Sequence, residues 1–188
     1  GFAVNVTSDE VDEIRKLDFV AAVYPDEQVN ISLQDSVPLI NADNVWNLGI
    51  TGQGVSIGII DTGVDHTHAD LGGCYGPGCK VVGGYDFVNK DNSPMDDHGH
   101  GTHVAATAAG DGALTGVAPD ATLYAYKVLN SGGSGSWSNV IAAIDRSVDP
   151  NQDRDYSDHL DIISLSLGGS GNADDPPSQA VENAVENG

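Results

Sequence analysis

Residues 97–106 read DHGHGTHVAA, so that three histidines fall within six residues, separated by glycines and followed by small apolar residues. Glycine lets the backbone approach another group closely and adopt left-handed dihedrals. The small residues at 104–109 are compatible with a helix that packs tightly against its neighbours. The stretch therefore predicts a polar loop that leads into a helix, with one histidine presented near the helix N-terminus.

A second stretch complements the first. Residues 55–65 read VSIGIIDTGVD, an apolar run that ends at Asp61. Such a run places a carboxylate at the carboxyl end of a buried strand, where open α/β sheets hold their reactive groups. A carboxylate held against an imidazole fixes its tautomer and stabilises the imidazolium. The two stretches together predict two members of an Asp–His–Ser triad.

Three segments resemble, in the same order, hallmark segments of the subtilisin-like serine proteases: IDTGVD at 60–65, HGTHVA at 100–105 and ISLSLGG at 163–169. The segments GVAP at 116–119 and YKVL at 126–129 are also similar to that family. The resemblance implies that Asp61 is the orienting acid and that His100 is the general base. It also implies peptide-bond hydrolysis through an acyl-enzyme, with protein or peptide substrates.

Two further segments of that family are missing from residues 1–188. The nucleophile lies in a Gly-Thr-Ser-Met-Ala-like segment and the oxyanion-hole asparagine in an Ala-Ala-Gly-Asn-like segment, and neither occurs here. Both are expected after Gly188, in a C-terminal remainder of the catalytic domain. We therefore expect residues 1–188 alone to show no protease activity.

The pattern of apolar segments predicts an α/β fold with a mostly parallel, doubly wound sheet, truncated relative to the family. Strands are expected at 55–60, 81–87, 122–127 and 161–167, and they alternate with helices at 102–109 and 137–147. A further short helix is expected within 37–46. The resemblance implies that residues 34–188 are the N-terminal part of a subtilisin-like catalytic domain.

Residues 1–33 have a different pattern, with strands expected at 1–6 and 19–24 around a helix that begins after Thr7. This small α+β segment resembles the second half of a subtilisin propeptide. The resemblance implies a folding aid that then occupies the cleft as an inhibitor, with cleavage within 26–36. The alternative is a permanent N-terminal subdomain without that role.

The Gly/Ser-rich run NSGGSGSW at 130–137 resembles the subtilisin loop that pairs with an extended substrate, and residues 166–169 would form the facing wall. A peptide held between two such edges gains main-chain hydrogen bonds on both sides. Trp137 would floor a pocket for an apolar side chain, although ordinary core packing is the alternative. The predicted substrate-binding residues are Gly133, Ser134, Gly135, Trp137, Ser166, Leu167 and Gly168.

The acidic loop at 149–161 alternates oxygen-bearing side chains as a calcium loop does. Arg154 replaces the usual glycine at position six and Leu160 replaces the glutamate at twelve, so the loop is EF-hand-like only. A solvated acidic loop is the alternative to a structural calcium ion. The predicted calcium ligands are Asp149, Asn151, Asp153, Asp155, Asp158 and Asp161.

Other metal sites are less well supported. His66, His68 and Asp70 are close in sequence and could indicate a zinc site, but a structural turn is the simpler interpretation. In the family an aspartate in the position of Asp70 often binds calcium together with an inserted loop. That site is not expected here, because the segment 105–116 is short.

Composition limits the partners and the compartment. Twenty-eight acidic residues against seven basic ones give a net charge of −21, which repels nucleic acid and anionic membranes. No apolar run approaches the ~20 residues of a membrane span, and no signal peptide opens the chain. Cys74 and Cys79 flank a Pro-Gly turn that lets the thiols meet, which predicts a disulfide and a secreted, extracellular protein. Free buried thiols are the alternative.

The residues are compatible with two other functions. A non-catalytic, calcium-stabilised extracellular module could bind extended peptides without cutting them. The DTG sequence at 61–63 could also indicate an aspartic protease, but that chemistry needs a second convergent aspartate, and no second copy of the motif is present.

Overall fold

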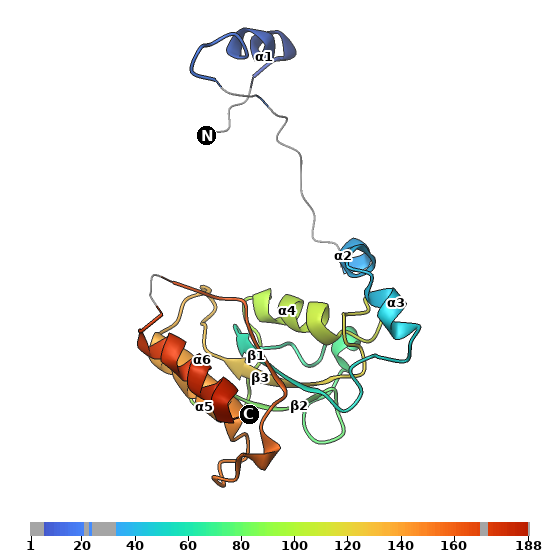
Figure 1. Ribbon diagram of the computed structural model, residues 1–188, viewed down its shortest axis with the longest axis vertical. Coiled ribbons are helices and arrows are strands. Elements are labelled where there is room, and N and C mark those ends of the chain that lie inside the picture. Colours follow the sequence, from blue (N-terminus) through green and yellow to red (C-terminus); the bar gives the residue numbers. More distant parts are fainter. Residues whose placement is uncertain (1–5, 21–22, 24–32, 170–172, 188) are drawn as a thin grey trace. The chain divides into compact units, whose positions relative to one another are not determined.

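The computed structural model describes residues 6–20, 23, 33–169 and 173–187 (Figure 1). The chain divides into two compact units, Gly1–Ser32 and Leu33–Gly188, called here the N-terminal unit and the main unit.

The N-terminal unit contains one helix, α1 (Ser8–Ile14), within its described residues. A capping box starts it, because the Thr7 backbone N–H and hydroxyl both donate to the Glu10 carboxylate, at 2.8 and 2.9 Å. Most of the two strands expected around this helix lies outside the described residues. Phe19 and Val20 are described, and they lie outside any strand.

The main unit is built on a four-stranded parallel sheet in the order β2-β3-β1-β4. The strands are β1 (Ser56–Asp61), β2 (Val81–Asp86), β3 (Thr122–Lys127) and β4 (Ile162–Leu165). Three of them fall within the stretches expected from the sequence, and β1 runs one residue past its expected end at residue 60. The mostly parallel α/β fold is confirmed. Asp61, at the end of β1, lies opposite Lys127 at the end of β3.

Helices cover both faces of this sheet (Figure 1). Helix α4 (His100–Ala109) packs on one face, and α5 (Trp137–Val148) and α6 (Pro176–Asn187) pack on the other. Two short helices precede the sheet, α2 (Leu33–Leu39) and α3 (Ala42–Trp46), where one helix was expected. Asn41, at φ 59°, separates them in the left-handed conformation.

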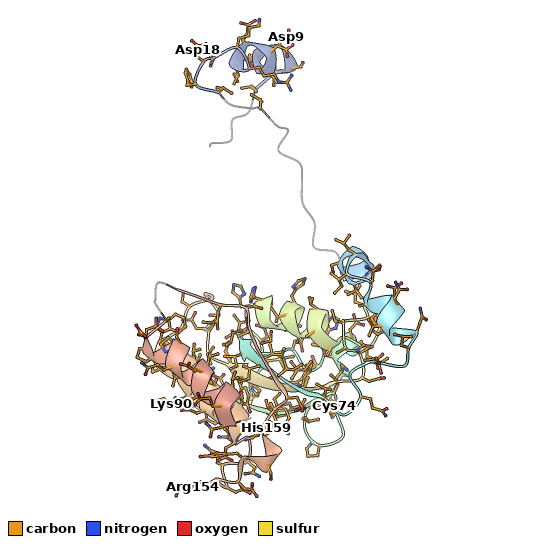
Figure 2. All side chains as sticks on the ribbon, in the orientation of Figure 1. Asp9, Asp18, Cys74, Lys90, Arg154 and His159 are labelled. Atoms are coloured by element: carbon orange, nitrogen blue, oxygen red, sulfur yellow. A yellow bond between two sulfur atoms is a disulfide. The ribbon has the colours of Figure 1, made fainter. Side chains whose placement is uncertain are left out.

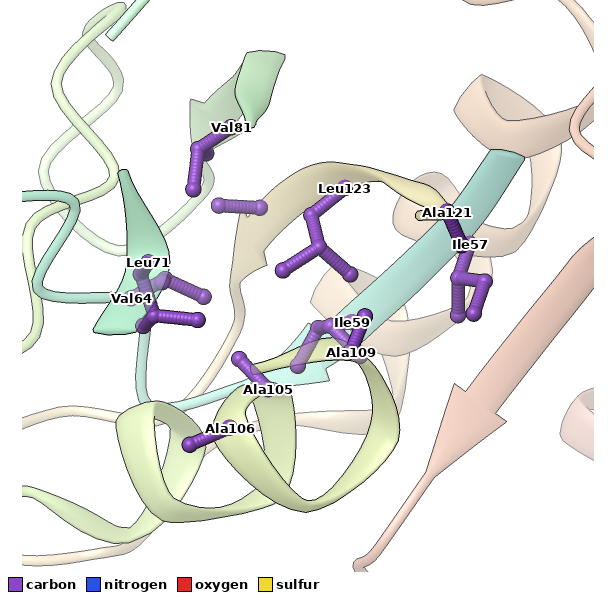
Figure 3. Packing of buried hydrophobic residues seen from close by; sticks show 11 residues of the cluster. Ile57, Ile59, Val64, Leu71, Val81, Ala105, Ala106, Ala109, Ala121 and Leu123 are labelled. Atoms are coloured by element: carbon purple, nitrogen blue, oxygen red, sulfur yellow. The ribbon is translucent and has the colours of Figure 1, made fainter. Parts of the chain in front are cut away.

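The strand alternation explains why there are two cores. Ile57 and Ile59 of β1 face α4, whereas Ile60 belongs to the cluster under α5 and α6. On the α4 side the helix contributes only Ala105, Ala106 and Ala109 to the buried cluster, beside larger residues of the strands (Figure 3). Small side chains let α4 lie close to the sheet, and this close approach positions the helix start beside the end of β1.

Helix α6 was not predicted from the sequence. Its buried residues are Ala180 and Ala184, one helical turn apart, while Val185 is exposed. Two alanines give a weak apolar signal, so the helix depends on packing against α5 rather than on an obvious apolar stripe.

Two further features were predicted from the sequence, a disulfide and the lack of a membrane-spanning segment. Cys74 and Cys79 are joined in a disulfide, with their Cα atoms 5.6 Å apart (Figure 2). Of the helices in the described part of the chain, none combines the length and the apolar character that crossing a bilayer requires.

Candidate active site

The centre of the site is a carboxylate at the end of the central strand. Asp61 is fully buried, and its Oδ1 lies 2.7 Å from Nδ1 of His100. The same oxygen accepts the backbone N–H of Thr62, also at 2.7 Å. Oδ2 is buried too, and it has no hydrogen-bond partner among the described residues.

His100 supplies the other half of the pair. An ionised carboxylate can only accept hydrogen bonds, so Nδ1 of His100 is the donor in the contact with Asp61. The neutral ring then carries its lone pair on Nε2, the atom that can take a proton from a nucleophile. The side chain of His100 is 45 % exposed, so it is accessible to a substrate.

Two glycines allow the helix to begin at this place. Gly99 precedes α4 at φ 101°, a conformation that favours glycine. Gly101 is buried against the end of β1, where a Cβ atom would overlap the carbonyl oxygen of Gly63 and lie 3.1 Å from Cβ of Asp61. The spacing HGTH therefore combines a histidine at the helix start with a contact that only glycine permits.

A buried lysine stabilises the carboxyl end of the sheet, where β1 and β3 both end. Lys127 is 1 % exposed, and its ammonium group donates to the carbonyl oxygens of Thr62 (2.7 Å) and Leu129 (3.0 Å). It also pairs with the Asp97 carboxylate at 2.5 Å. All three ammonium protons thus have acceptors, which is what a buried charge requires. Lys127 belongs to the YKVL segment at 126–129, but no role was predicted for it, although a lysine that ends an apolar strand was the available signal.

Asp96 is a carboxylate near the Asp61–His100 pair that was not predicted from the sequence. Burial raises the pKa of Asp96, but hydrogen bonds from Thr102 and from the backbone N–H groups of Gly99 and His98 outweigh that effect. The net pKa lies below the usual value for an aspartate. The residue is therefore ionised under ordinary conditions.

One cavity of about 660 Å³ brings the predicted residues together. His100 lies at its edge with all of the residues expected to bind substrate, and His98, Thr62 and Leu129 also line it. The predicted residues in its wall are Gly133, Ser134, Gly135, Trp137, Ser166, Leu167 and Gly168. The loop before α5 and the segment after β4 thus form two walls of one cleft.

A second, smaller cavity of about 370 Å³ adjoins the cleft. Trp137 lines both cavities and remains 40 % exposed, so it is not an ordinary core residue. Val140, Ile144 and Leu167 make much of the smaller cavity apolar. Another cavity, of about 760 Å³, lies at the other end of α5 beside Asp145 and Arg146, away from His100.

The acidic loop is arranged around its own backbone. Asp149, Asn151, Asp153 and Asp155 each accept a backbone N–H from a residue further along the loop. Arg154, at the tip (Figure 2), has φ 69°, the conformation that the glycine of a calcium loop adopts. In the residues that the structure describes, no group of three or more His, Cys, Asp or Glu side chains is placed to hold a metal ion.

The end of the acidic loop has another role. Asp161 accepts both the backbone N–H and the hydroxyl of Ser56, each at 2.8 Å. These bonds hold the pKa of Asp161 below its usual value. Asp161 therefore fastens the loop to the start of β1, and of the six predicted ligands it is the one engaged with a strand. Asp158 lies in the short turn Tyr156–Asp158.

The histidines after β1 form a structural turn, as the simpler interpretation held. Nδ1 of His68 accepts the backbone N–H of Asp70 at 3.2 Å, and the ring of His66 packs on Tyr75. The buried Asp70 carboxylate accepts the backbone N–H groups of Ala113 and Leu114. The short loop after α4 thus satisfies this carboxylate directly.

Comparison with known proteins gives consistent results. The family model described as the subtilase family, peptidase S8, matches residues 52–188. The minor extracellular protease Vpr of Bacillus subtilis (strain 168) is 40 % identical over 215 aligned positions, covering 100 % of this chain and 25 % of that protein. Subtilisin DY of Bacillus licheniformis is 42 % identical over 155 positions, covering 81 % of this chain and 50 % of that one.

Among solved structures, the crystal structure of a cold adapted subtilisin-like serine proteinase matches with a TM-score of 0.60 and 34 % identity. The match covers 74 % of this chain and 45 % of that one. The chain thus spans between a quarter and a half of the length of these relatives.

Proposed function

The chain belongs to the subtilase family, and from this premise we propose that it supplies the acid and the base of a serine endopeptidase. The observation that carries the proposal is the 2.7 Å contact between Asp61 and His100 at the edge of a two-walled cleft. Residues 1–188 contain neither the serine segment nor the oxyanion-hole segment of the family. The nucleophile therefore has to come from outside these residues.

In the proposed reaction, Nε2 of His100 takes the proton of the serine hydroxyl as its oxygen attacks the peptide carbonyl. His100 then gives that proton to the leaving amine, and water releases the acyl group by the same steps. Asp61 keeps the proton of the neutral ring on Nδ1 and stabilises the imidazolium that forms.

The cleft gives the proposal a substrate class. An extended peptide between residues 133–135 and 166–168 would receive main-chain hydrogen bonds from both walls, as in strand addition to a sheet edge. The adjoining cavity beside Trp137 would accept an apolar side chain of that peptide. Because backbone contacts dominate, we propose tolerance of many sequences with a preference for an apolar residue upstream of the cut.

Three finer features belong to the same proposal. The disulfide between Cys74 and Cys79 supports secretion, since such bonds persist in oxidising compartments. The resemblance of residues 1–33 to a propeptide supports a role in folding and inhibition. The alternating oxygen donors of the acidic loop have suitable chemistry for a structural calcium ion. Binding would require the loop carboxylates to draw together, since in the described residues no three of them are placed to hold an ion.

The test uses the full-length protein in which residues 1–188 occur. Hydrolysis of a peptide substrate and labelling by a serine-directed phosphonate are expected. His100→Ala and Asp61→Asn should lower kcat by roughly 10⁴- to 10⁶-fold, since triad members act as a unit. Residues 1–188 alone should neither hydrolyse the peptide nor take the label.

Activity that survives His100→Ala would contradict the assigned base. Peptide binding without hydrolysis or labelling, in a protein that carries a family serine segment, would instead support the non-catalytic peptide-binding module.

A further inference from the structure

Asp96 makes more hydrogen bonds than its place in a surface loop would suggest. Its Oδ1 accepts the Thr62 hydroxyl and the backbone N–H groups of His98 and Gly99, each at 2.9 Å. Its Oδ2 accepts the backbone N–H and the hydroxyl of Thr102, at 2.9 and 2.6 Å. Both oxygens are thus engaged, one toward the end of β1 and the other toward the first turn of α4.

The two threonine hydroxyls cross-link these elements. The hydroxyl of Thr62, after β1, accepts the backbone N–H of Gly101 in α4 at 2.9 Å. The hydroxyl of Thr102, in α4, accepts the backbone N–H of Asp65 after β1 at 2.8 Å. Each hydroxyl has one proton to donate. Both donate it in a hydrogen bond to Asp96, because an ionised carboxylate can only accept. The carboxylate therefore fixes the direction in which both hydroxyls point.

This network surrounds the Asp61–His100 pair. Thr62 is the residue after Asp61, and Gly101 is the residue after His100. Few hydrogen bonds fix the carboxylate of Asp61. Among the described residues its Oδ2 has no partner, and its Oδ1 accepts one backbone N–H besides the contact with His100. The spacing between Asp61 and His100 is accordingly set by the backbones that carry them.

We propose that Asp96 is a positioning residue that holds Asp61 and His100 in alignment, acting through the hydroxyls of Thr62 and Thr102. This inference rests on the proposed function for its catalytic meaning, but the alignment itself can be measured without activity. Asp96 touches neither side chain of the pair, so its effect is transmitted through the ends of β1 and α4.

Asp96→Asn is the informative change. An amide offers one acceptor oxygen, and its NH₂ group must then face either the Thr102 backbone N–H or the N–H groups of His98 and Gly99. One side of the network is lost in each orientation. The proton on Nδ1 of His100, held by Asp61, should give a far-downfield resonance in the NMR spectrum of residues 1–188. This resonance is expected to disappear in Asp96→Asn.

The matched control is Asp86→Asn. Asp86 is a buried aspartate at the end of β2 whose carboxylate likewise accepts backbone N–H groups, from Val88 and Asn89, without contacting the pair. This variant should keep the resonance even if it loses similar thermal stability. A second test changes Thr62, with loss expected in Thr62→Val and retention in Thr62→Ser, which keeps the hydroxyl.

In the longest active protein, Asp96→Asn should lower kcat roughly 10- to 100-fold with little change in KM, as expected for a small misplacement of reacting groups. A resonance that persists in folded Asp96→Asn, or that is lost equally in Asp86→Asn, would overturn the inference and leave the proposed function intact. A resonance absent from the unaltered chain would instead show that the Asp61–His100 contact itself is not formed, and the proposed function would lose its main support.

Discussion

At the scale of single residues, Gly101 is tightly constrained where α4 meets the end of β1. The site tolerates no Cβ, because the carbonyl oxygen of Gly63 occupies that space. A helix interior ordinarily favours alanine over glycine by about 0.5–1 kcal/mol, whereas overpacking costs about 1–3 kcal/mol. Steric overlap should therefore dominate over helix propensity.

Gly101→Ala is expected to lower the free energy of unfolding by about 1–3 kcal/mol, which corresponds to a fall of about 2–4 °C in Tm per kcal/mol for a chain of this size. Thermal unfolding of residues 1–188 measures it. Gly168→Ala is the control, because a Cβ there meets nothing within 4 Å. An unchanged or raised Tm for Gly101→Ala would show that the helix start has room to move.

Site residues that lie in short sequence motifs could be predicted, whereas the residues that hold them in place through hydrogen bonds and ion pairs could not. Asp61 and His100 are marked by local patterns, and the structure places their side chains in contact. Asp96 and Lys127 matter through partners far away in sequence, with Asp96 bonding 34 residues back to Thr62 and Lys127 pairing 30 residues back with Asp97. No local pattern specifies such partners, since the folded backbone brings them together.

At the scale of secondary-structure elements, the strands were predicted well and the connections less so. The mainly buried strands β1 and β3 were predicted from apolar runs, since parallel strands buried on both faces are nearly continuously hydrophobic. Strands β2 and β4 are only partly buried, and their apolar runs are shorter. Helix α6 was missed, because its buried face consists of two alanines. The acidic loop was recognised by its alternating oxygens, but the use of Asp161 as a fastening to Ser56 depends on tertiary structure.

The acidic loop leads to a prediction about calcium. A bound ion should raise the Tm of residues 1–188 above its value in the presence of a chelator. By mass action, the free energy of unfolding rises by about 2.7 kcal/mol at a calcium concentration of 100 Kd. Asp153→Asn combined with Asp155→Asn should remove the shift. Glu182→Gln combined with Glu186→Gln, on α6, should keep it. An equal shift in both double variants would place the ion elsewhere, and no shift in the unaltered chain would exclude calcium from the loop.

At the scale of the whole molecule, the division into an N-terminal unit and a main unit raises the question of processing. If residues 1–33 act as a propeptide, the mature enzyme should begin within 26–36, and N-terminal sequencing of the purified active protein measures this directly. His100→Ala should leave residues 1–33 attached if the enzyme makes the cut itself. An active form that still begins at or before Gly1 would show a permanent subdomain.

The order of the strands has a consequence for how the main unit folds. The central strand β1 has its partners on either side much later in the chain, and Ser56 at its start bonds to Asp161 across 105 residues. Closing so long a loop costs entropy before the contacts that repay it exist, and sheets built from such distant pairings form slowly. During synthesis β1 leaves the ribosome before β3 and β4, so its backbone edges are unpaired and its apolar faces uncovered until those strands follow. We therefore expect the pairing of β4 with β1 to be a slow step of folding, which a segment that shields β1 in the interval would speed.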